Sequence, residues 1–114
     1  MSAALDERAL CHLDDIPEGT SLGIERDEQA YVAIKKRGQV YLYRNSCPHI
    51  GSRLEWQQHQ FLDADKMLIQ CANHGALFRI DNGLCVAGPC IGDRLDIVEF
   101  KINENSIFLL KQHR

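Results

Sequence analysis

Four side chains of this 114-residue chain form two short groups whose chemistry suits a metal centre. Cys47 and His49 have one residue between them, and after an interval of twenty-one residues Cys71 and His74 have two residues between them. Each group offers one soft thiolate and one imidazole, a donor set that favours zinc or an iron–sulfur cluster over a hard cation. Two loops so far apart in the sequence can close on one centre from opposite sides.

The order of residues within the groups bears on which metal is bound. A tetrahedral zinc site of two cysteines and two histidines is a common structural centre and is the alternative. Zinc-binding segments, however, usually pair cysteine with cysteine and histidine with histidine. Here both groups are mixed, as a cluster with two unlike irons requires, because two thiolates can hold one iron and two imidazoles the other.

The two groups also resemble the cluster-binding loops of the Rieske family. Residues 47–51 (Cys-Pro-His-Ile-Gly) are similar to the first loop, and residues 71–75 (Cys-Ala-Asn-His-Gly) are similar to the second. The pair Gly88-Pro89 resembles the proline-bearing loop that covers the cluster in that family. The resemblance implies that the chain carries one [2Fe–2S] cluster. Its implied ligands are Cys47 and Cys71 on the inner iron and His49 and His74 on the outer iron.

Departures from the family pattern bear on the reduction potential. Respiratory Rieske proteins carry a further cysteine in each loop, joined as a disulfide, and the matching positions here are Ser52 and Asn73. Those proteins also place hydroxyl groups after the second histidine, where this chain has Ala76 and Phe78. Fewer hydrogen bonds to sulfur leave the reduced, more negative cluster less stabilised. We therefore expect a potential near the low end of the Rieske range, roughly −150 mV.

Other cysteines and apolar residues surround the expected cluster loops. Cys85 and Cys90 flank Gly88-Pro89, and in a cytoplasmic chain we expect two reduced thiols near a hydrophobic cover, with a regulatory disulfide as the alternative. Cys11 is expected in the core. Apolar residues are expected to shield the cluster from water, with a docking surface as the alternative, at 54–56 and 61–62 and at Ile50, Leu77 and Pro89. The remaining histidines lack a partner motif and are expected to be ordinary side chains: His12, His59 and His113.

The rest of the chain consists of short apolar runs separated by turn residues. Strands are expected near residues 9–12, 21–25, 31–35, 40–43, 98–102 and 107–110. Turns of hairpins are expected at 81–83 and 103–105. Residues 54–65 would hold at most a turn or two of helix. This pattern predicts an all-β antiparallel sandwich or barrel, with one domain over 1–114 and a cluster-binding subdomain at about 45–92.

Composition narrows the cellular setting and the classes of partner. The formal charge of −3, without a basic stripe, argues against a nucleic-acid binder. The first residues include Asp6 and Glu7, where a signal peptide would need a cationic and then an apolar run. No stretch approaches the roughly 18 apolar residues that span a bilayer. We therefore expect the whole chain to be a soluble cytoplasmic protein that binds neither membrane nor nucleic acid.

The resemblance implies an electron carrier and not a catalyst. The carrier ferredoxins that this chain resembles pass electrons from a flavin reductase to a terminal oxygenase. A second reading is an accessory subunit of a larger redox enzyme, such as the small Rieske-like subunit of a nitrite reductase. A third is a zinc-stabilised binding module without redox activity, which metal analysis would distinguish at once.

Overall fold

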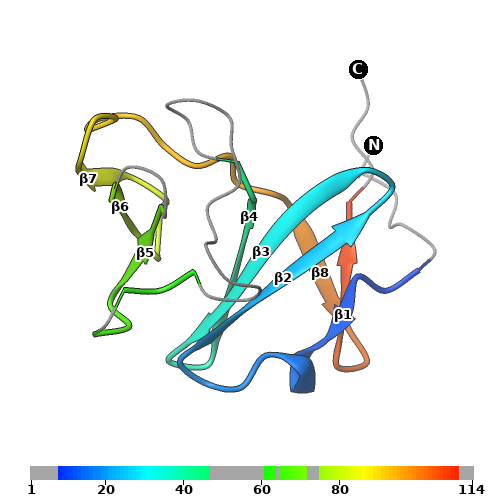
Figure 1. Ribbon diagram of the computed structural model, residues 1–114. Coiled ribbons are helices and arrows are strands. Elements are labelled where there is room, and N and C mark those ends of the chain that lie inside the picture. Colours follow the sequence, from blue (N-terminus) through cyan, green and yellow to red (C-terminus); the bar gives the residue numbers. More distant parts are fainter. Residues whose placement is uncertain (1–7, 47–60, 64, 72–74, 111–114) are drawn as a thin grey trace.

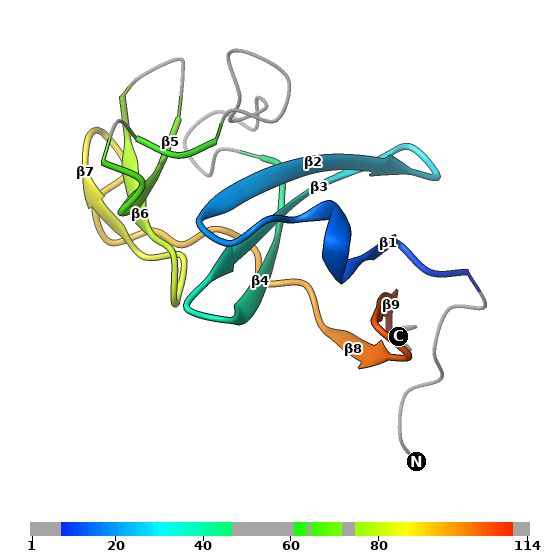
Figure 2. The same ribbon diagram turned by 90° about the horizontal axis from the view of Figure 1, so that it is seen from below.

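Nearly all the regular structure in the described part of the chain is β-strand. The computed structural model describes residues 8–46, 61–63, 65–71 and 75–110, and within them it has three antiparallel sheets of three strands each. Figures 1 and 2 show the three sheets in a row, with one sheet between the other two. The helical structure in these residues is a single 3₁₀ turn, η1 (Leu13–Asp15). The predicted all-β antiparallel fold is confirmed.

The three sheets are named here by their position. The base sheet, in the middle of the row, has the strand order β2 (Thr20–Arg26), β3 (Gln29–Lys36) and β4 (Gln39–Arg44). The terminal sheet has the order β1 (Cys11–His12), β9 (Ser106–Leu109) and β8 (Phe100–Asn103). The distal sheet has the order β5 (Leu68–Gln70), β6 (Leu77–Arg79) and β7 (Cys85–Ala87).

The base sheet separates two hydrophobic cores. Successive side chains of a strand point to opposite faces of the sheet, and on β3 both sets are buried. Val32 and Ile34 belong to the core shared with the distal sheet, and Tyr31 and Ala33 belong to the core shared with the terminal sheet. A strand that is buried on both faces reads as a continuous apolar run, which explains the pattern at 31–34.

Two-residue turns join the strands of the base sheet. Asp27 and Glu28 connect β2 to β3, and Arg37 and Gly38 connect β3 to β4. All four residues have positive φ, as the turn type that matches the twist of a hairpin requires. The Glu18 carboxylate accepts hydrogen bonds from the backbone N–H groups of Arg37 at 2.6 Å and Gly38 at 2.9 Å. These two bonds hold the pKa of Glu18 below its usual value, with the Gly38 bond the larger cause.

The terminal sheet closes the second core and continues from the base sheet. Residues 96–98 lie along β4, with backbone hydrogen bonds from Arg44 to Asp96 and from Val98 to Leu42. The predicted half-buried strand at 98–102 is observed as β8 from Phe100, but its alternation fails at Ile102, which is 49% exposed. Ile102 pairs with the fully buried Ile107 on β9, but it lies on β8, the edge strand of the terminal sheet, where its side chain is only partly covered.

The distal sheet is smaller and less regular. Its strands have three residues each, and the pairing of β6 with β7 shifts register between Leu77 and Phe78. A bridge between Leu62 and Ile69 adds a short further edge beside β5. Side chains that are fully buried fill this sheet's side of the core: Phe61, Ile69, Cys71, Ala76 and Phe78.

Two side chains tie the base sheet to the distal sheet. The Tyr43 hydroxyl on β4 is buried and donates to the carbonyl of Ile80 at 2.5 Å. Burial, then the nearby charge of Asp81, raises the pKa of Tyr43 to about 12, so the hydroxyl keeps its proton at any physiological pH. Lys36 Nζ, at the end of β3, donates to the carbonyl of Lys66 at 2.7 Å and contacts Met67 Sδ at 3.3 Å.

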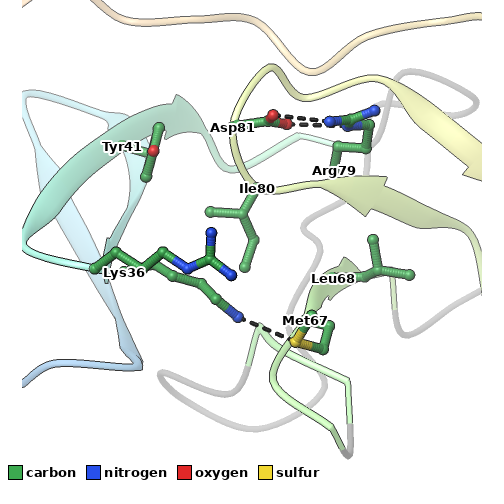
Figure 3. A pocket seen from close by; sticks show the side chains of 8 residues that line it. Lys36, Tyr41, Met67, Leu68, Arg79, Ile80 and Asp81 are labelled. Carbon is green, nitrogen blue, oxygen red and sulfur yellow. Dashed lines mark hydrogen bonds and ion pairs between the residues drawn. The ribbon is translucent and has the colours of Figure 1, made fainter.

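An open cleft of about 230 Å³ marks this boundary between the two sheets. Figure 3 shows Lys36 reaching across it to Met67, while Arg79 and Asp81 pair with each other at its edge. The Arg79–Asp81 pair is bidentate, with N···O distances of 3.0 and 2.9 Å. Lys36 and Arg79 on the wall of the cleft are thus engaged with other groups of the protein.

Candidate metal centre

Cys71 lies on the tight turn that joins β5 to β6. Its side chain is fully buried, its N–H donates to the carbonyl of Ala76 at 2.8 Å, and its carbonyl accepts from the Gly75 N–H at 2.9 Å. Gly75 has φ +66, a conformation that glycine adopts without steric cost. The second predicted loop is therefore the tip of the β5–β6 hairpin, and the hairpin fixes the backbone on both sides of it.

The other three predicted ligands lie outside the described residues: Cys47, His49 and His74. The same holds for Ile50, Ser52, Asn73, His59, His113 and the apolar residues at 54–56. Their assignments stay predictions.

The described residues on each side of residues 47–60 are held by backbone hydrogen bonds. At the end of β4, Asn45 is buried and its N–H donates to the carbonyl of Ala30 at 2.9 Å. On the far side, Gln70 donates its N–H to the carbonyl of Phe61 at 2.8 Å. The described residues before Cys47 thus pair with the base sheet, and Phe61 pairs with the residue that precedes Cys71.

Phe61 answers one question that the sequence left open. Its side chain is fully buried, in the same core as Cys71 and Phe78. Phe61 therefore shields the interior next to the cysteine and cannot form a docking surface.

The predicted cover lies against the second loop. Gly88 has φ +98, and a Cβ added there would lie 2.8 Å from the Cα of Ala76, too close for any side chain. Glycine is thus needed at 88 both for its backbone conformation and for this close approach. Since Ala76 accepts the Cys71 backbone bond, the Gly88-Pro89 segment contacts the turn that carries Cys71.

Ala76 and Phe78 are both fully buried directly after this turn. Neither side chain has a polar hydrogen to donate to a sulfur atom. The hydroxyl of Tyr43, a further residue of this core, donates to the carbonyl of Ile80. No sequence signal identified Tyr43, because its partner is a backbone carbonyl 37 residues away.

One histidine and three cysteines among the described residues lie outside the predicted ligand set. His12 is exposed, and its Nδ1 lies 3.0 Å from the hydroxyl of the buried Ser106. Cys11 is half-buried at the edge of the second core, where burial and then Asp15 raise its pKa to about 11. Cys85 and Cys90 are deeply buried and their Sγ atoms lie 3.0 Å apart.

The donor chemistry that the structure describes fits an iron–sulfur cluster. A buried thiolate is a soft ligand, and the backbone around Cys71 is held by a hairpin, a glycine and a packed cover. Within residues 8–46, 61–63, 65–71 and 75–110, no group of three or more cysteine, histidine or acidic side chains forms a competing metal site.

Comparison with known proteins gives the family. A model of the Rieske [2Fe-2S] domain matches residues 6–112. The chain belongs to the Rieske family. The predicted resemblance is thereby confirmed, and the cofactor of this family is one [2Fe–2S] cluster, which favours the cluster over the zinc alternative.

Relatives of this Rieske chain include small ferredoxins and longer proteins. Ferredoxin CarAc of Metapseudomonas resinovorans is 28% identical over 102 residues, which are 88% of this chain and 89% of the relative. Human apoptosis-inducing factor 3 is 26% identical over 103 residues, which are 90% of this chain but 16% of that protein. The same Rieske unit thus occurs both nearly alone and as a small part of a larger protein.

Solved structures share the fold at low sequence identity. The ferredoxin of carbazole 1,9a-dioxygenase from Nocardioides aromaticivorans IC177 superposes with a TM-score of 0.72 at 19% identity, covering 92% of this chain and 97% of that one. This similarity confirms the Rieske-ferredoxin architecture of the three sheets. No helix in the described residues is long and apolar enough to cross a bilayer.

Proposed function

We propose that this Rieske protein is a soluble, cytoplasmic electron carrier that takes one electron at a time from a flavin reductase and delivers it to a terminal oxygenase. The observation that carries the proposal is the near full-length match to a ferredoxin, with 88% of this chain aligned to 89% of CarAc. Among the solved neighbours, a carbazole 1,9a-dioxygenase ferredoxin occurs in complex with its oxygenase. An electron carrier performs no bond-making on a substrate, so the chain is not itself a catalyst.

The proposed ligands are the four residues of the two loops. Cys47 and Cys71 would hold the inner iron, and His49 and His74 the outer iron. The support is the family match across both loops together with the buried position of Cys71 on its turn. When bound, the cluster supplies a reversible one-electron couple.

The protein's own residues set the surroundings of that couple. Phe61, Phe78 and Ala76 exclude water from the side of the core that contains Cys71. Water exclusion and the lack of hydroxyl donors after the second loop both disfavour additional negative charge, which supports a potential near the low end of the Rieske range, roughly −150 mV.

The exposed rim of the cover offers a small apolar contact for a redox partner. Val86 is 43% exposed and Ile91 is 68% exposed, on either side of Gly88-Pro89. Redox encounters typically bury less than about 1,200 Å², so a few such residues suffice for brief docking.

Voltammetry and purification together test the proposal. We expect a reversible one-electron wave near the low end of the Rieske range. We also expect that the tagged protein, purified from the cells that make it naturally, carries no other protein in fixed proportion. A flavin or haem enzyme that co-purifies in fixed proportion would instead favour the accessory-subunit reading. A protein that takes up no electron would contradict both readings.

A further inference from the structure

Two thiols lie in contact beneath the cover and are not part of the predicted ligand set. Cys90 Sγ donates to Cys85 Sγ at 3.0 Å, and Cys85 Sγ donates to the Ala87 carbonyl at 3.2 Å. A disulfide bond is about 2.05 Å long, so the two sulfur atoms need to approach by only about 1 Å. The two sulfur atoms are thus close enough for oxidation to a disulfide with little movement.

Backbone hydrogen bonds fold the segment so that these two cysteines meet. The Cys85 N–H donates to the carbonyl of Asp93 at 2.8 Å, and the Asp93 N–H donates to the carbonyl of Cys90 at 2.9 Å. The second bond closes a turn over residues 90–93, and this turn holds Cys90 next to Cys85 on β7. The proximity of the thiols therefore follows from the main-chain fold of residues 85–93 and not from a freely chosen side-chain rotamer alone.

Only a short, exposed loop separates these thiols from solvent. Each thiol residue is 2% exposed, yet the residues around Cys90 are exposed: Gly88, Pro89, Ile91 and Gly92. Opening of such a loop costs less than unfolding of a core strand. A small oxidant can thus reach the sulfur atoms when the loop opens locally.

We propose that Cys85 and Cys90 are a thiol–disulfide exchange site, which a low-molecular-weight disulfide such as glutathione disulfide converts to an intramolecular disulfide. One glutathione disulfide is reduced to two glutathione molecules, while the two thiols lose their hydrogens and form the Sγ–Sγ bond. The intermediate is a mixed disulfide on one cysteine, which the second thiol resolves.

The ring formed in this way encloses the part of the cover that contacts the second cluster loop. Gly88 lies between the two cysteines and against the backbone of Ala76. The disulfide would restrict opening of the cover, and we expect the cluster to be lost more slowly from the oxidised form. This consequence rests on the proposed ligand role of Cys71, whereas the thiol chemistry itself does not.

Peptide mapping tests the exchange site directly. The intact holoprotein is incubated without oxygen with excess glutathione disulfide, quenched in acid, alkylated under denaturing conditions and digested with trypsin. Cleavage after Arg79 and Arg94 places Cys85 and Cys90 together in one peptide, apart from the other three cysteines. The expected product is that peptide without alkylation and lighter by two hydrogens, and dithiothreitol should restore the dialkylated form.

Two results would overturn the exchange site. One is a peptide from the folded protein that stays fully alkylated, although the same oxidant mixture oxidises the thiols of Cys85 and Cys90 when the protein is unfolded in urea. The other is a stable glutathione adduct on either cysteine of the wild type, because a resolving thiol at 3.0 Å should remove it. In the Cys90→Ser variant, by contrast, the adduct on Cys85 should persist.

A chelator assay tests the effect on the cluster with an independent readout. Loss of visible absorbance is followed for the thiol and disulfide forms, and we expect several-fold slower loss from the disulfide form. The Cys85→Ala, Cys90→Ala double variant should lose its cluster at one rate, whatever the oxidant. Equal rates for the two wild-type forms would refute the coupling but not the exchange site. An error in the ligand assignment would leave the peptide result unchanged.

Discussion

The base sheet and the distal sheet differ in strand length, in the turns that join their strands and in the regularity of their register. Strands of six to eight residues in the base sheet are joined by two-residue turns and pair in continuous register. The distal sheet has three residues per strand and a register shift, and longer connections leave it at each end. Both sheets contribute buried side chains to a core, but the base sheet has the longer hydrogen-bonded pairing and the tight turns, whereas the distal sheet also depends on the close backbone approach of Gly88 to Ala76.

This difference explains where a cluster-binding loop can be placed. A turn with few ladder hydrogen bonds can adopt the backbone that metal ligands need, and metal binding then contributes to its folding. The base sheet supplies the rigid support through Tyr43 and Lys36. We therefore expect changes in the distal sheet to alter the cluster first, and changes in the base sheet to alter general stability.

Substitution of Cys71 should have the largest effect. The Cys71→Ser variant replaces the proposed thiolate ligand with a hard and weaker donor, so we expect at least a tenfold loss of cluster absorbance and a distal sheet that unfolds first. Iron analysis and hydrogen exchange measure the two effects. The matched variant Cys11→Ser, at the other core, should keep its colour. A normal visible spectrum for Cys71→Ser would contradict the ligand assignment.

The close approach of the cover to the second loop can be broken at one glycine. In Gly88→Ala, backbone strain at φ +98 adds to a contact of 2.8 Å with Ala76, and we expect a loss of about 2–3 kcal/mol in the free energy of unfolding. Gly92→Ala is the matched control, because φ is +94 there and no atom lies within 4 Å. It should cost about 1 kcal/mol. Equal losses in denaturant titrations would show that the contact with Ala76 carries no energy.

Hydroxyl groups placed after the second loop should raise the reduction potential of the cluster. The Ala76→Ser, Phe78→Tyr double variant supplies two donors, and hydrogen bonds worth about 1–2 kcal/mol to the reduced state would raise the potential by roughly 40–85 mV. Voltammetry measures the shift, and Phe108→Tyr on the terminal sheet is the control that should leave the potential unchanged. An unchanged potential in the double variant would mean that other donors govern the cluster.

Removal of the Tyr43 hydroxyl tests the tie between the two sheets. Tyr43→Phe leaves the buried carbonyl of Ile80 without its donor, and we expect a loss of about 1 kcal/mol in the free energy of unfolding. Tyr41→Phe, on the same strand, serves as the control in the same denaturant titration. A free energy of unfolding equal to that of wild type would show that the hydrogen bond from Tyr43 to Ile80 does not contribute to stability.

The smallest effect is expected at the turn that Glu18 caps. Since its pKa is lowered in the folded state, its contribution is fully present above the usual glutamate pKa and is lost as pH falls through the folded value. Glu18→Gln should therefore be less stable than wild type at pH 7, and the two should converge in acid. Thermal unfolding from pH 7 to pH 3 measures this, with the exposed Glu99→Gln as control. A difference that grows in acid would contradict the assigned pKa direction.

Local sequence pattern predicted the strands of the base sheet and the hairpin turns well, and the contacts between distant segments poorly. The runs at 31–35 and 40–43 became β3 and β4, and the turns at 81–83 and 103–105 lie between paired strands, because alternation and turn residues act over neighbouring positions. The approach of Gly88 to Ala76 and the contact of Tyr43 with Ile80 depend on packing between segments far apart in the sequence. For the same reason the sequence showed Cys85 and Cys90 as neighbours but not whether their thiols meet.

The four ligands were predicted from spacing and family resemblance. The proposed role as an electron carrier depends on this assignment. Nitrogen electron–nuclear double resonance of the reduced protein tests it most directly, because it detects ring nitrogens bonded to the iron that holds the unpaired electron density. The account predicts two inequivalent histidine couplings, one of which disappears in a His49 variant and the other in a His74 variant that still binds iron. A reduced cluster without nitrogen coupling would contradict it.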